Sequence, residues 1–280
     1  PIVFIAENPG EVLFTGNSTL RVGGEYVEVN GLKFINGYSV DETPVIAFRE
    51  NSKNLANHCR VTNCVIDNYN NPNRLVEDNW VALYGRHNRF DHNYIANKKN
   101  LGTTMVVILN DTLNQENEHR IDHNYFGERP RLGSNGGETL RIGTSTFSRT
   151  SSKTIVEDNY FEHCNGEVEI ISVKSLDNTI RRNTFFECEG PLTLRHGDNT
   201  TIYDNFFIGN DKPNTGGVRV INAHHKIYDN FFYKLAGDGF RSALAILNGV
   251  PNSPINRYYQ VKDVVIANNV FIDCNSVTLS

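Results

Sequence analysis

Short runs of alternating apolar and polar residues recur along the chain, and most of them surround one asparagine. The shared pattern is an aliphatic residue, two variable residues, Asn, a variable residue and an aromatic or apolar closing residue, as in RIDHNYF from Arg120 and TIYDNFF from Thr201. The steps from Asn93 are 31, 35, 24, 22, 25 and 39 residues, and they lead to Asn124, Asn159, Asn183, Asn205, Asn230 and Asn269. A repeat of about 22 to 25 residues with some longer steps predicts a stack of similar coils.

The residue types in the repeats predict β-structure in these coils. Each repeat is rich in Val, Ile, Thr, Phe and Tyr, contains turn formers, and shows no helical periodicity. About 22 residues at roughly 3.3 Å per residue trace three short strands and their bends. The sequence therefore predicts an all-β fold, a single-stranded parallel β-helix with coils about 4.8 Å apart.

The repeated asparagines and three cysteines are interpreted as parts of the fold. We expect each Asn to lie at a bend, where its amide bonds the equivalent Asn above and below, and where Asn tolerates a left-handed φ. Cys164, Cys188 and Cys274 each follow the Asn of their coil by five residues. They are predicted to form an interior column.

The repeats indicate one elongated domain. They continue from about Val61 to Phe271 with no linker or low-complexity tract, so residues 1–280 are expected to form a single parallel β-helix domain. Both ends are expected to be trimmed or uncapped, because the chain starts and stops in strand-like sequence.

Composition narrows the classes of function. Five Cys without metal-site spacing make a disulfide framework improbable and leave at least one free thiol. No apolar stretch is long enough to span a membrane. A net charge of -5 and a pI near 6.0 argue against general nucleic-acid binding.

Charged residues gather in four segments that break the coil pattern in the same part of successive turns. These are NGGETLRIG from Asn135, NGEVEIISVKS from Asn165, GPLTLRHG from Gly190 and TGGVRVIN from Thr215. Aligned as strands, they place Leu140, Val168, Leu194 and Val218 or Val220 inward. One outward column then contains Arg141, Glu169, Arg195 and Arg219, and the column beside it contains Thr139, Glu167, Thr193 and Gly217. The plain alternative for each arginine is a cross-strand salt-bridge ladder.

Two glutamates in this cluster point to a metal site. Glu167 and Glu169 are expected to project from the same side of one strand, within about 7 Å, and to repel unless a cation or an arginine neutralises them. With the Asn135 amide one coil earlier, they offer hard oxygen ligands suited to Ca²⁺. Mg²⁺ fits less well, and there is no His/Cys set for zinc.

Lys174 and Arg195 are candidates for acid–base chemistry. Lys174 follows Glu169 by five residues and is expected just past a bend, and Arg195 lies 21 residues later, close to one coil. A lysine between a cation and an arginine has its ammonium form disfavoured, so the neutral amine can act as a base. In isolation, Lys174 also fits a solvated surface lysine, and His196 fits either a hydrogen bond to substrate or the end of a turn.

The segments NGGETLRIG, NGEVEIISVKS and LRHG, in that order, resemble polysaccharide lyase family 6, which includes alginate lyases and chondroitinase B. The resemblance covers essentially the whole chain and implies a right-handed parallel β-helix. It implies that Lys174 is the Brønsted base and Arg195 the Brønsted acid. It also implies that Asn135, Glu167 and Glu169 bind Ca²⁺, and that the substrate contacts are Glu138, Arg141, His196 and Arg219.

The activity implied by the resemblance is β-elimination on a polyuronate. The arginine column predicts an anionic polysaccharide, and alginate is the first choice because no dedicated sulfate-binding cluster is found. Dermatan sulfate is the alternative substrate for the same chemistry. A noncatalytic carbohydrate-binding β-helix is an alternative of a different class. The polymeric substrate implies a secreted or periplasmic protein.

Overall fold

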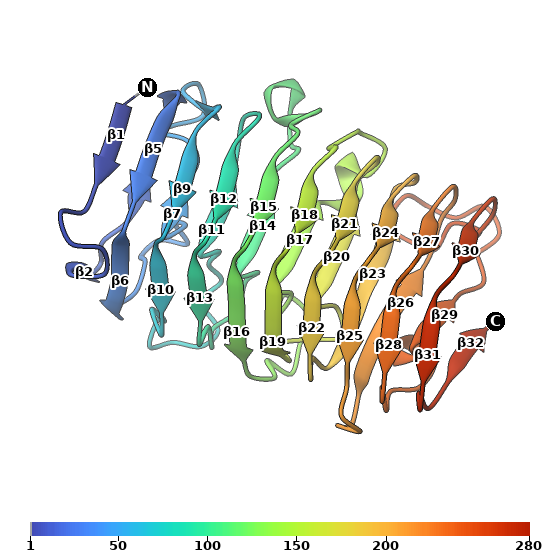
Figure 1. Ribbon diagram of the computed structural model, residues 1–280. Coiled ribbons are helices and arrows are strands. Elements are labelled where there is room, and N and C mark those ends of the chain that lie inside the picture. The colour runs from blue at the N-terminus through green and yellow to red at the C-terminus, as the bar shows by residue number, and fades with distance from the viewer. Residues whose placement is uncertain (1) are drawn as a thin grey trace.

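The computed structural model describes residues 2–280 and consists of ten coils stacked into a parallel β-helix (Figure 1). Each coil contributes one strand to each of three ten-stranded sheets, A, B and C, in which neighbouring strands are parallel. The predicted all-β fold and the three strands per repeat are confirmed. The coils run from β1 at one end to β32 at the other, so each sheet is assembled from residues about one repeat apart.

The strands are short, and their bounds follow the repeat. Sheet A contains β1 (Ile2–Ile5), β5 (Val27–Asn30), β9 (Arg60–Thr62), β12 (Arg89–Asp91), β15 (Arg120–Asp122), β18 (Ile155–Glu157), β21 (Thr179–Arg181), β24 (Thr201–Tyr203), β27 (Lys226–Tyr228) and β30 (Val265–Ala267). Sheet B contains β2 (Val12–Gly16), β6 (Leu32–Gly37), β10 (Val65–Asp67), β13 (Tyr94–Ala96), β16 (Tyr125–Arg129), β19 (Tyr160–Cys164), β22 (Thr184–Phe186), β25 (Phe206–Ile208), β28 (Phe231–Tyr233) and β31 (Val270–Ile272). Sheet C contains β3 (Leu20–Arg21), β7 (Ile46–Ala47), β11 (Val81–Leu83), β14 (Met105–Val107), β17 (Leu140–Gly143), β20 (Ile171–Lys174), β23 (Gly190–His196), β26 (Thr215–Val220), β29 (Leu244–Ile246) and β32 (Val277–Leu279).

The remaining elements are small. A two-stranded sheet joins β4 (Gly24–Glu25) to β8 (Ala56–Asn57). Three 3₁₀ turns, η1 (Thr112–Asn114), η2 (Ser145–Phe147) and η3 (Gly239–Arg241), lie in connections between strands. Residues 2–280 contain no α-helix, as the absence of helical periodicity predicts. None of the helical turns in this part of the chain is long and apolar enough to cross a membrane.

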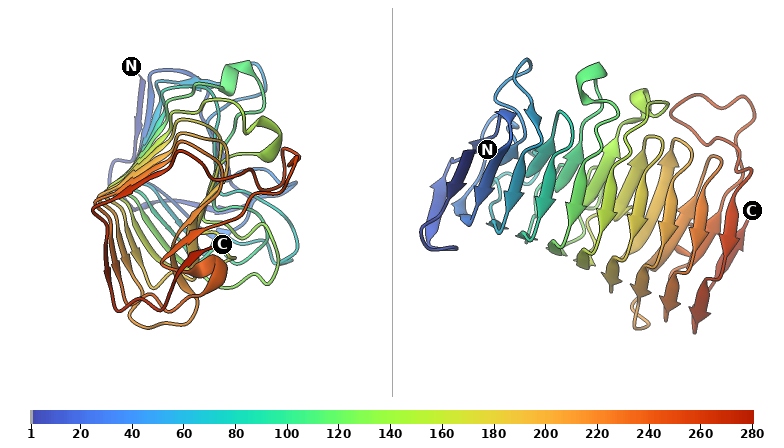
Figure 2. Two further views of the ribbon diagram at one scale, coloured as in Figure 1. Left: turned by 90° about the vertical axis from the view of Figure 1, so that its right-hand side faces the viewer. Right: turned by 45° about the horizontal axis from the view of Figure 1, so that its top comes forward.

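Inward-facing side chains form a continuous core between the three sheets, which surround it when viewed along the axis (Figure 2). A column of phenylalanines under sheet B shows the spacing of the coils. Its ring centroids lie 4.6 to 5.0 Å apart, and the column contains Phe126, Phe161, Phe185, Phe207, Phe232 and Phe271. Parallel rings at this distance are in van der Waals contact, so each coil buries the apolar face of the next.

The repeated asparagines form a hydrogen-bonded ladder at the bend between sheets A and B. Each ladder Asn donates from Nδ2 to Oδ1 of the ladder Asn in the next coil, at 2.9 to 3.0 Å from Asn93 to Asn269. The predicted bonding between equivalent amides is thereby confirmed. The predicted left-handed φ of these asparagines is wrong, because the residue before each one takes that conformation, for example His92 at 55° and Asp204 at 55°.

A second column of polar side chains lies just before the strands of sheet A, and the sequence pattern did not reveal it. Asn88 Oδ1 accepts from the backbone N–H of Cys59 at 2.9 Å, and His119 Nδ1 accepts from that of Asn88 at 3.2 Å. His225 Nδ1 accepts from the N–H of Thr200 at 3.1 Å. These side chains satisfy buried backbone donors at a bend, as the Asn ladder does.

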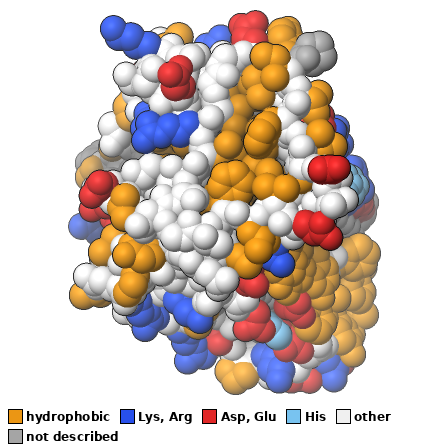
Figure 3. All heavy atoms as spheres, turned by 90° about the vertical axis from the view of Figure 1, so that its left-hand side faces the viewer, with side chains coloured by type: hydrophobic (Ala, Val, Ile, Leu, Met, Phe, Trp, Pro, Cys, Tyr) orange, Lys and Arg blue, Asp and Glu red, His pale blue; other side chains and the backbone are white. Residues whose placement is uncertain are grey.

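All five cysteines are free thiols, and Cys164 and Cys188 are buried in one column, as predicted, whereas Cys274 is only partly buried. At the end of the stack that carries β1, apolar side chains reach the surface (Figure 3). Val3 and Ile5 on β1 are each more than half exposed, because β1 pairs with β5 alone.

Candidate active site

A cleft of about 470 Å³ lies on the outer face of sheet C, where residues of β17, β20, β23 and β26 meet the segments that precede these strands. All the predicted site residues except His196 line this cleft. They are Asn135, Glu138, Arg141, Glu167, Glu169, Lys174, Arg195 and Arg219. Residues separated by up to 84 positions in the chain therefore reach one surface, because the coils stack in register.

The strand register differs from the predicted alignment. Arg141 pairs with Ser172, Ser172 pairs with Thr193, and Thr193 pairs with Arg219. Arg141 and Arg219 thus share an outward column, but Glu169 and Arg195 do not belong to it. The alignment failed because Glu169 lies three residues before Ser172, outside the strand, and because Arg195 lies two residues beyond Thr193 in β23. Leu140, Leu194, Val218 and Val220 are buried as predicted, whereas Val168 is half-buried and lines the cleft.

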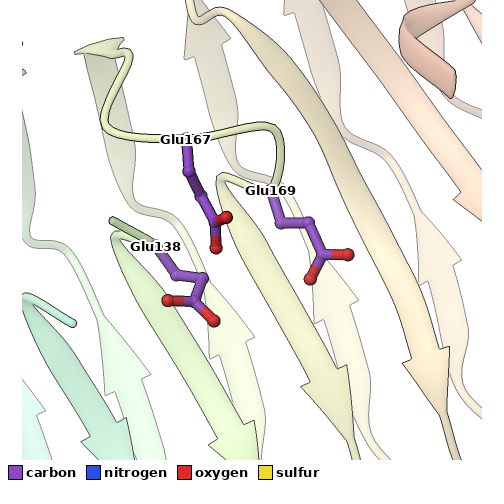
Figure 4. A group of neighbouring side chains, drawn as sticks. All are labelled: Glu138, Glu167 and Glu169. Carbon is purple, nitrogen blue, oxygen red and sulfur yellow. The ribbon is translucent and has the colours of Figure 1, made fainter. Parts of the chain in front are cut away.

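Three carboxylates that line this cleft crowd together (Figure 4). One oxygen from each of Glu138, Glu167 and Glu169 lies within 4.8 Å of the others. Glu167 and Glu169 belong to the bend segment 165–170 rather than to one strand, so that prediction is wrong, yet their side chains still point to the same side. Glu138, predicted as a substrate contact, supplies the third carboxylate.

The electrostatics of this acidic cluster fit a bound cation. Burial, reinforced by the neighbouring Glu138 and Glu169, raises the pKa of Glu167 to about 8, and burial also raises the pKa of Glu169. Glu138 Oε2 is buried without a hydrogen-bond partner in residues 2–280. A hard divalent cation would neutralise the repulsion and coordinate this oxygen, and oxygen ligands are the type that Ca²⁺ prefers. The exposed Asn135 lines the same cleft and provides an amide oxygen.

The cationic side chains lie around the acidic cluster. Lys174 is the last residue of β20, not a residue past a bend, and its Nζ lies 3.7 Å from Glu138 Oε1. Glu169 Oε1 lies 3.8 Å from Arg195 Nε and 3.5 Å from Arg219 Nη1. The amine and the two guanidinium groups therefore border the carboxylates, and an anionic sugar placed between them meets positive charge.

His196 lies beneath this surface. It is opposite Lys174 in the sheet, only 2 % of it is exposed, and it is absent from the residues that line the cleft. Burial, followed by the nearby charges of Arg195 and Lys174, lowers the pKa of His196 to about 3. The ring is therefore neutral at physiological pH. Its Nδ1 has no hydrogen-bond partner within residues 2–280.

Two aromatic residues that the sequence did not suggest complete the cleft. Tyr258 accepts a hydrogen bond from Arg219 Nη2 at 3.2 Å, and its ring centroid lies 4.6 Å from Arg195 Cζ. The ring of Phe240, in η3, lies 4.2 Å from Arg219 Cζ. The only signal for Tyr258 was the 39-residue step from Asn230 to Asn269, which implies an insertion in that coil. Such cation–π contacts hold a guanidinium in a fixed direction.

A buried arginine supports the backbone that carries the acidic cluster. Arg129 donates to the carbonyl oxygens of Gly137 at 2.7 Å and Gly102 at 2.7 Å, and to Thr104 Oγ1 at 2.9 Å. Gly166 packs so closely against Gly137 and Arg129 that a Cβ atom there would overlap both. This close approach brings Glu167 next to Glu138, although they come from different coils.

Comparisons with known proteins agree with this architecture. The sequence model of the family described as Chondroitinase B matches residues 1–279. Among solved structures, the PL6 family alginate lyase AlyGC is 56 % identical with a TM-score of 0.93, over 94 % of this chain and 36 % of AlyGC. A mannuronic acid specific polysaccharide family 6 lyase from human gut microbiota is 38 % identical with a TM-score of 0.91, over 100 % of this chain and 65 % of that one. No curated protein matches the chain.

A third solved structure, a PL6 alginate lyase in complex with a trisaccharide, is 25 % identical with a TM-score of 0.89, over 97 % of this chain and 61 % of that one. The chain thus spans 36 % of AlyGC and just under two thirds of the other two proteins. These matches cover nearly all of the present chain and only a part of each larger protein.

Proposed function

The chain belongs to the chondroitinase B family, polysaccharide lyase family 6, and on this premise we propose that it cleaves alginate by β-elimination. One observation carries the proposal: Lys174 and Arg195 line the same cleft as the three crowded carboxylates. The names of the two solved relatives at 56 % and 38 % identity, an alginate lyase and a lyase specific for mannuronic acid, support the choice of substrate.

The neutral amine of Lys174 removes the proton from C5 of the uronate that follows the cleaved bond. The C5–H electron pair forms a C4–C5 double bond, and the C4–O4 bond breaks, so the products are a new reducing end and an unsaturated uronate. Arg195 stabilises the departing O4. Since an arginine rarely releases its proton near neutral pH, water supplies the proton that O4 takes up. Arg141 and Arg219 hold the carboxylates of neighbouring sugars.

The acidic cluster takes a Ca²⁺ ion in this proposal. Glu138, Glu167 and Glu169 would hold it, with the amide oxygen of Asn135 as a further ligand. When bound, the ion supplies positive charge opposite the sugar carboxylate, which gains electron density as C5 loses its proton. Tyr258 and Glu169 orient the guanidinium groups of Arg195 and Arg219. Because alginate is a polymer, we place the protein outside the cytoplasm, either secreted or in the periplasm.

Incubation with alginate and Ca²⁺ tests the proposal through the ultraviolet absorbance of unsaturated uronate. We expect absorbance to rise with the unaltered protein, and we expect Lys174→Ala to abolish it while the circular dichroism spectrum stays unchanged. Lys226→Ala is the matched control, because Lys226 is an exposed lysine on β27 of sheet A and does not line the cleft. This control should keep full activity.

Three outcomes would change the conclusion. Cleavage of dermatan sulfate but not of alginate would overturn the substrate and retain the mechanism. Binding of alginate without any absorbance change would overturn the enzymatic proposal in favour of a noncatalytic carbohydrate-binding module. An active Lys174→Ala variant would show that another group removes the C5 proton.

A further inference from the structure

A second cavity, of about 410 Å³, lies directly beside the cleft. The two share Asn135, Glu167 and Val168, and the bend segment 165–170 therefore forms the divide between them. The other walls come from the residues that precede the strands of sheet C, including Glu189 before β23 and Asn214 before β26. A long molecule that occupies the cleft and passes Glu167 enters this second cavity.

Two arginines line the second cavity, and they differ in their partners. Arg131 is ion-paired with Glu189 across it. The guanidinium of Arg241, by contrast, makes no hydrogen bond or ion pair within residues 2–280, and its Nε is buried. A buried guanidinium nitrogen without an acceptor is costly, so Arg241 is suited to an anionic group supplied by a ligand.

The short turn η3 contributes one residue to each of the two cavities. Phe240 reaches into the cleft and lies against Arg219, and the next residue, Arg241, lines the second cavity. The same turn therefore contacts whatever occupies either space. A ligand that spans both would be held from one side by adjacent residues of a single element.

The chemistry of the second cavity fits a sugar that carries one carboxylate. Glu189 lines it as well, and its negative charge beside the acidic Glu167 disfavours a dense anion such as phosphate or sulfate. Sugar hydroxyls can instead donate hydrogen bonds to these glutamates and exchange hydrogen bonds with the amide of Asn214. The carboxylate of the same sugar then remains for Arg241.

We propose that the second cavity binds a further uronate unit of the polysaccharide whose scissile bond lies in the cleft, with Arg241 holding its carboxylate. This inference rests on the proposed function, because the chain must first accept a polyuronate. Its consequence is a preference for longer chains. A short oligosaccharide fills the cleft alone, whereas a longer one gains the charge-assisted hydrogen bonds of Arg241 as well.

The test compares kcat/KM on a trisaccharide and a hexasaccharide of uronate, in the presence of Ca²⁺, for the unaltered protein and Arg241→Gln. We expect the hexasaccharide-to-trisaccharide ratio of kcat/KM to fall about tenfold in Arg241→Gln, because a charge-assisted contact is lost only for the longer chain. Arg241→Lys, which keeps the charge and loses the planar fork, should give an intermediate ratio. Lys226→Gln, a neutralised lysine outside both cavities, should keep the ratio unchanged.

Each result decides the inference. A hexasaccharide-to-trisaccharide ratio that is the same in Arg241→Gln, Arg241→Lys and the unaltered protein overturns it, while the proposed function stands. An unaltered protein that cleaves no uronate chain overturns the proposed function instead. Calorimetric titration of Lys174→Ala with the hexasaccharide, with and without Arg241→Gln, then still measures the site, and equal affinities in the two proteins would refute it.

Discussion

The side-chain nitrogen of Lys174 lies 3.7 Å from the carboxylate of Glu138, which comes from the preceding coil. Glu138 also belongs to the acidic cluster with Glu167 and Glu169, so a single side chain links the proposed base to the proposed metal ligands. Glu138 thus couples proton removal by Lys174 to the charge of the proposed metal site. A change at Glu138 should therefore affect metal binding and catalysis together.

We predict that Glu138→Gln weakens Ca²⁺ binding by about tenfold or more, because the number of charged ligands sets calcium affinity. The metal-free variant should not lose stability, since one of three crowded carboxylates becomes neutral. Calorimetric Ca²⁺ titration and chemical denaturation measure the two effects. Glu11→Gln, a change at an exposed glutamate outside the cleft, is the control. Unchanged Ca²⁺ affinity in Glu138→Gln would exclude Glu138 as a ligand.

The phenol of Tyr258 offers a second test, because its hydroxyl and its ring have different partners. Tyr258→Phe removes the acceptor for Arg219 Nη2 and keeps the ring near Arg195. The lost hydrogen bond to a charged group should lower kcat/KM on alginate about 10-fold. Tyr258→Ala also removes the cation–π contact and should lower it further. Equal rates for Tyr258→Ala and the unaltered protein would show that the insertion has no part in the site.

The fold was predictable because it repeats. Every coil uses an asparagine for the same hydrogen bond at the same bend, so the Asn ladder from Asn93 to Asn269 is visible as sequence periodicity. The second column at the sheet A bends was missed, because different residue types there accept the same kind of hydrogen bond from a backbone N–H. The residues are Asn88, His119 and His225. Periodicity detects a shared residue, and it does not detect a shared hydrogen bond.

The sequence predicted which residues form the site better than it predicted how they are arranged. Stacking coils of similar length brings Lys174, Arg195 and the glutamates to one face, and that requires only the repeat length. Strand register is more demanding, since the column of Arg141 continues through Ser172 to Thr193, and Arg195 lies two residues beyond Thr193. Tyr258 comes from an insertion whose path is set by tertiary contacts. Repeat spacing therefore reveals that the insertion exists, and it does not reveal where the side chain of Tyr258 lies.

The buried ring of His225 makes stability depend on pH. Its Nδ1 accepts from Thr200 and its Nε2 donates to the carbonyl of Ile221, so the fold requires the neutral ring. Burial lowers the pKa of His225 to about 4, below the ordinary value of about 6.5. As pH falls, His225 therefore becomes protonated at a higher pH in the unfolded chain than in the folded chain. This contribution to stability is complete above about pH 6.5 and is lost as pH falls toward 4, by up to about 1.4 kcal/mol per pH unit.

We predict that His225→Asn reduces this slope, because Asn occupies the equivalent bend in other coils, at Asn88 and Asn178, and does not titrate. Denaturant unfolding at several pH values between 7 and 4.5 gives the free energy of unfolding for both proteins. The curves should converge as pH falls. Parallel curves would mean that His225 is protonated equally in the folded and unfolded chains.

Gly166 allows a direct test of how backbone packing shapes the acidic cluster. Its φ is not in the left-handed region, so alanine is conformationally allowed there, but the added Cβ would overlap the carbonyl oxygen of Gly137 and the side chain of Arg129. The bend segment 165–170 must then move away from Glu138, and Glu167 moves with it.

We predict that Gly166→Ala weakens Ca²⁺ binding and lowers kcat/KM on alginate, each by about tenfold, since displacing a catalytic group by about 1 Å costs up to 10²-fold. The Asn ladder lies at a different bend, so the thermal midpoint of the metal-free protein should fall by only a few degrees, on the order of 1 kcal/mol. A variant with unchanged Ca²⁺ affinity and activity would show that the close contact between these coils is not what positions Glu167.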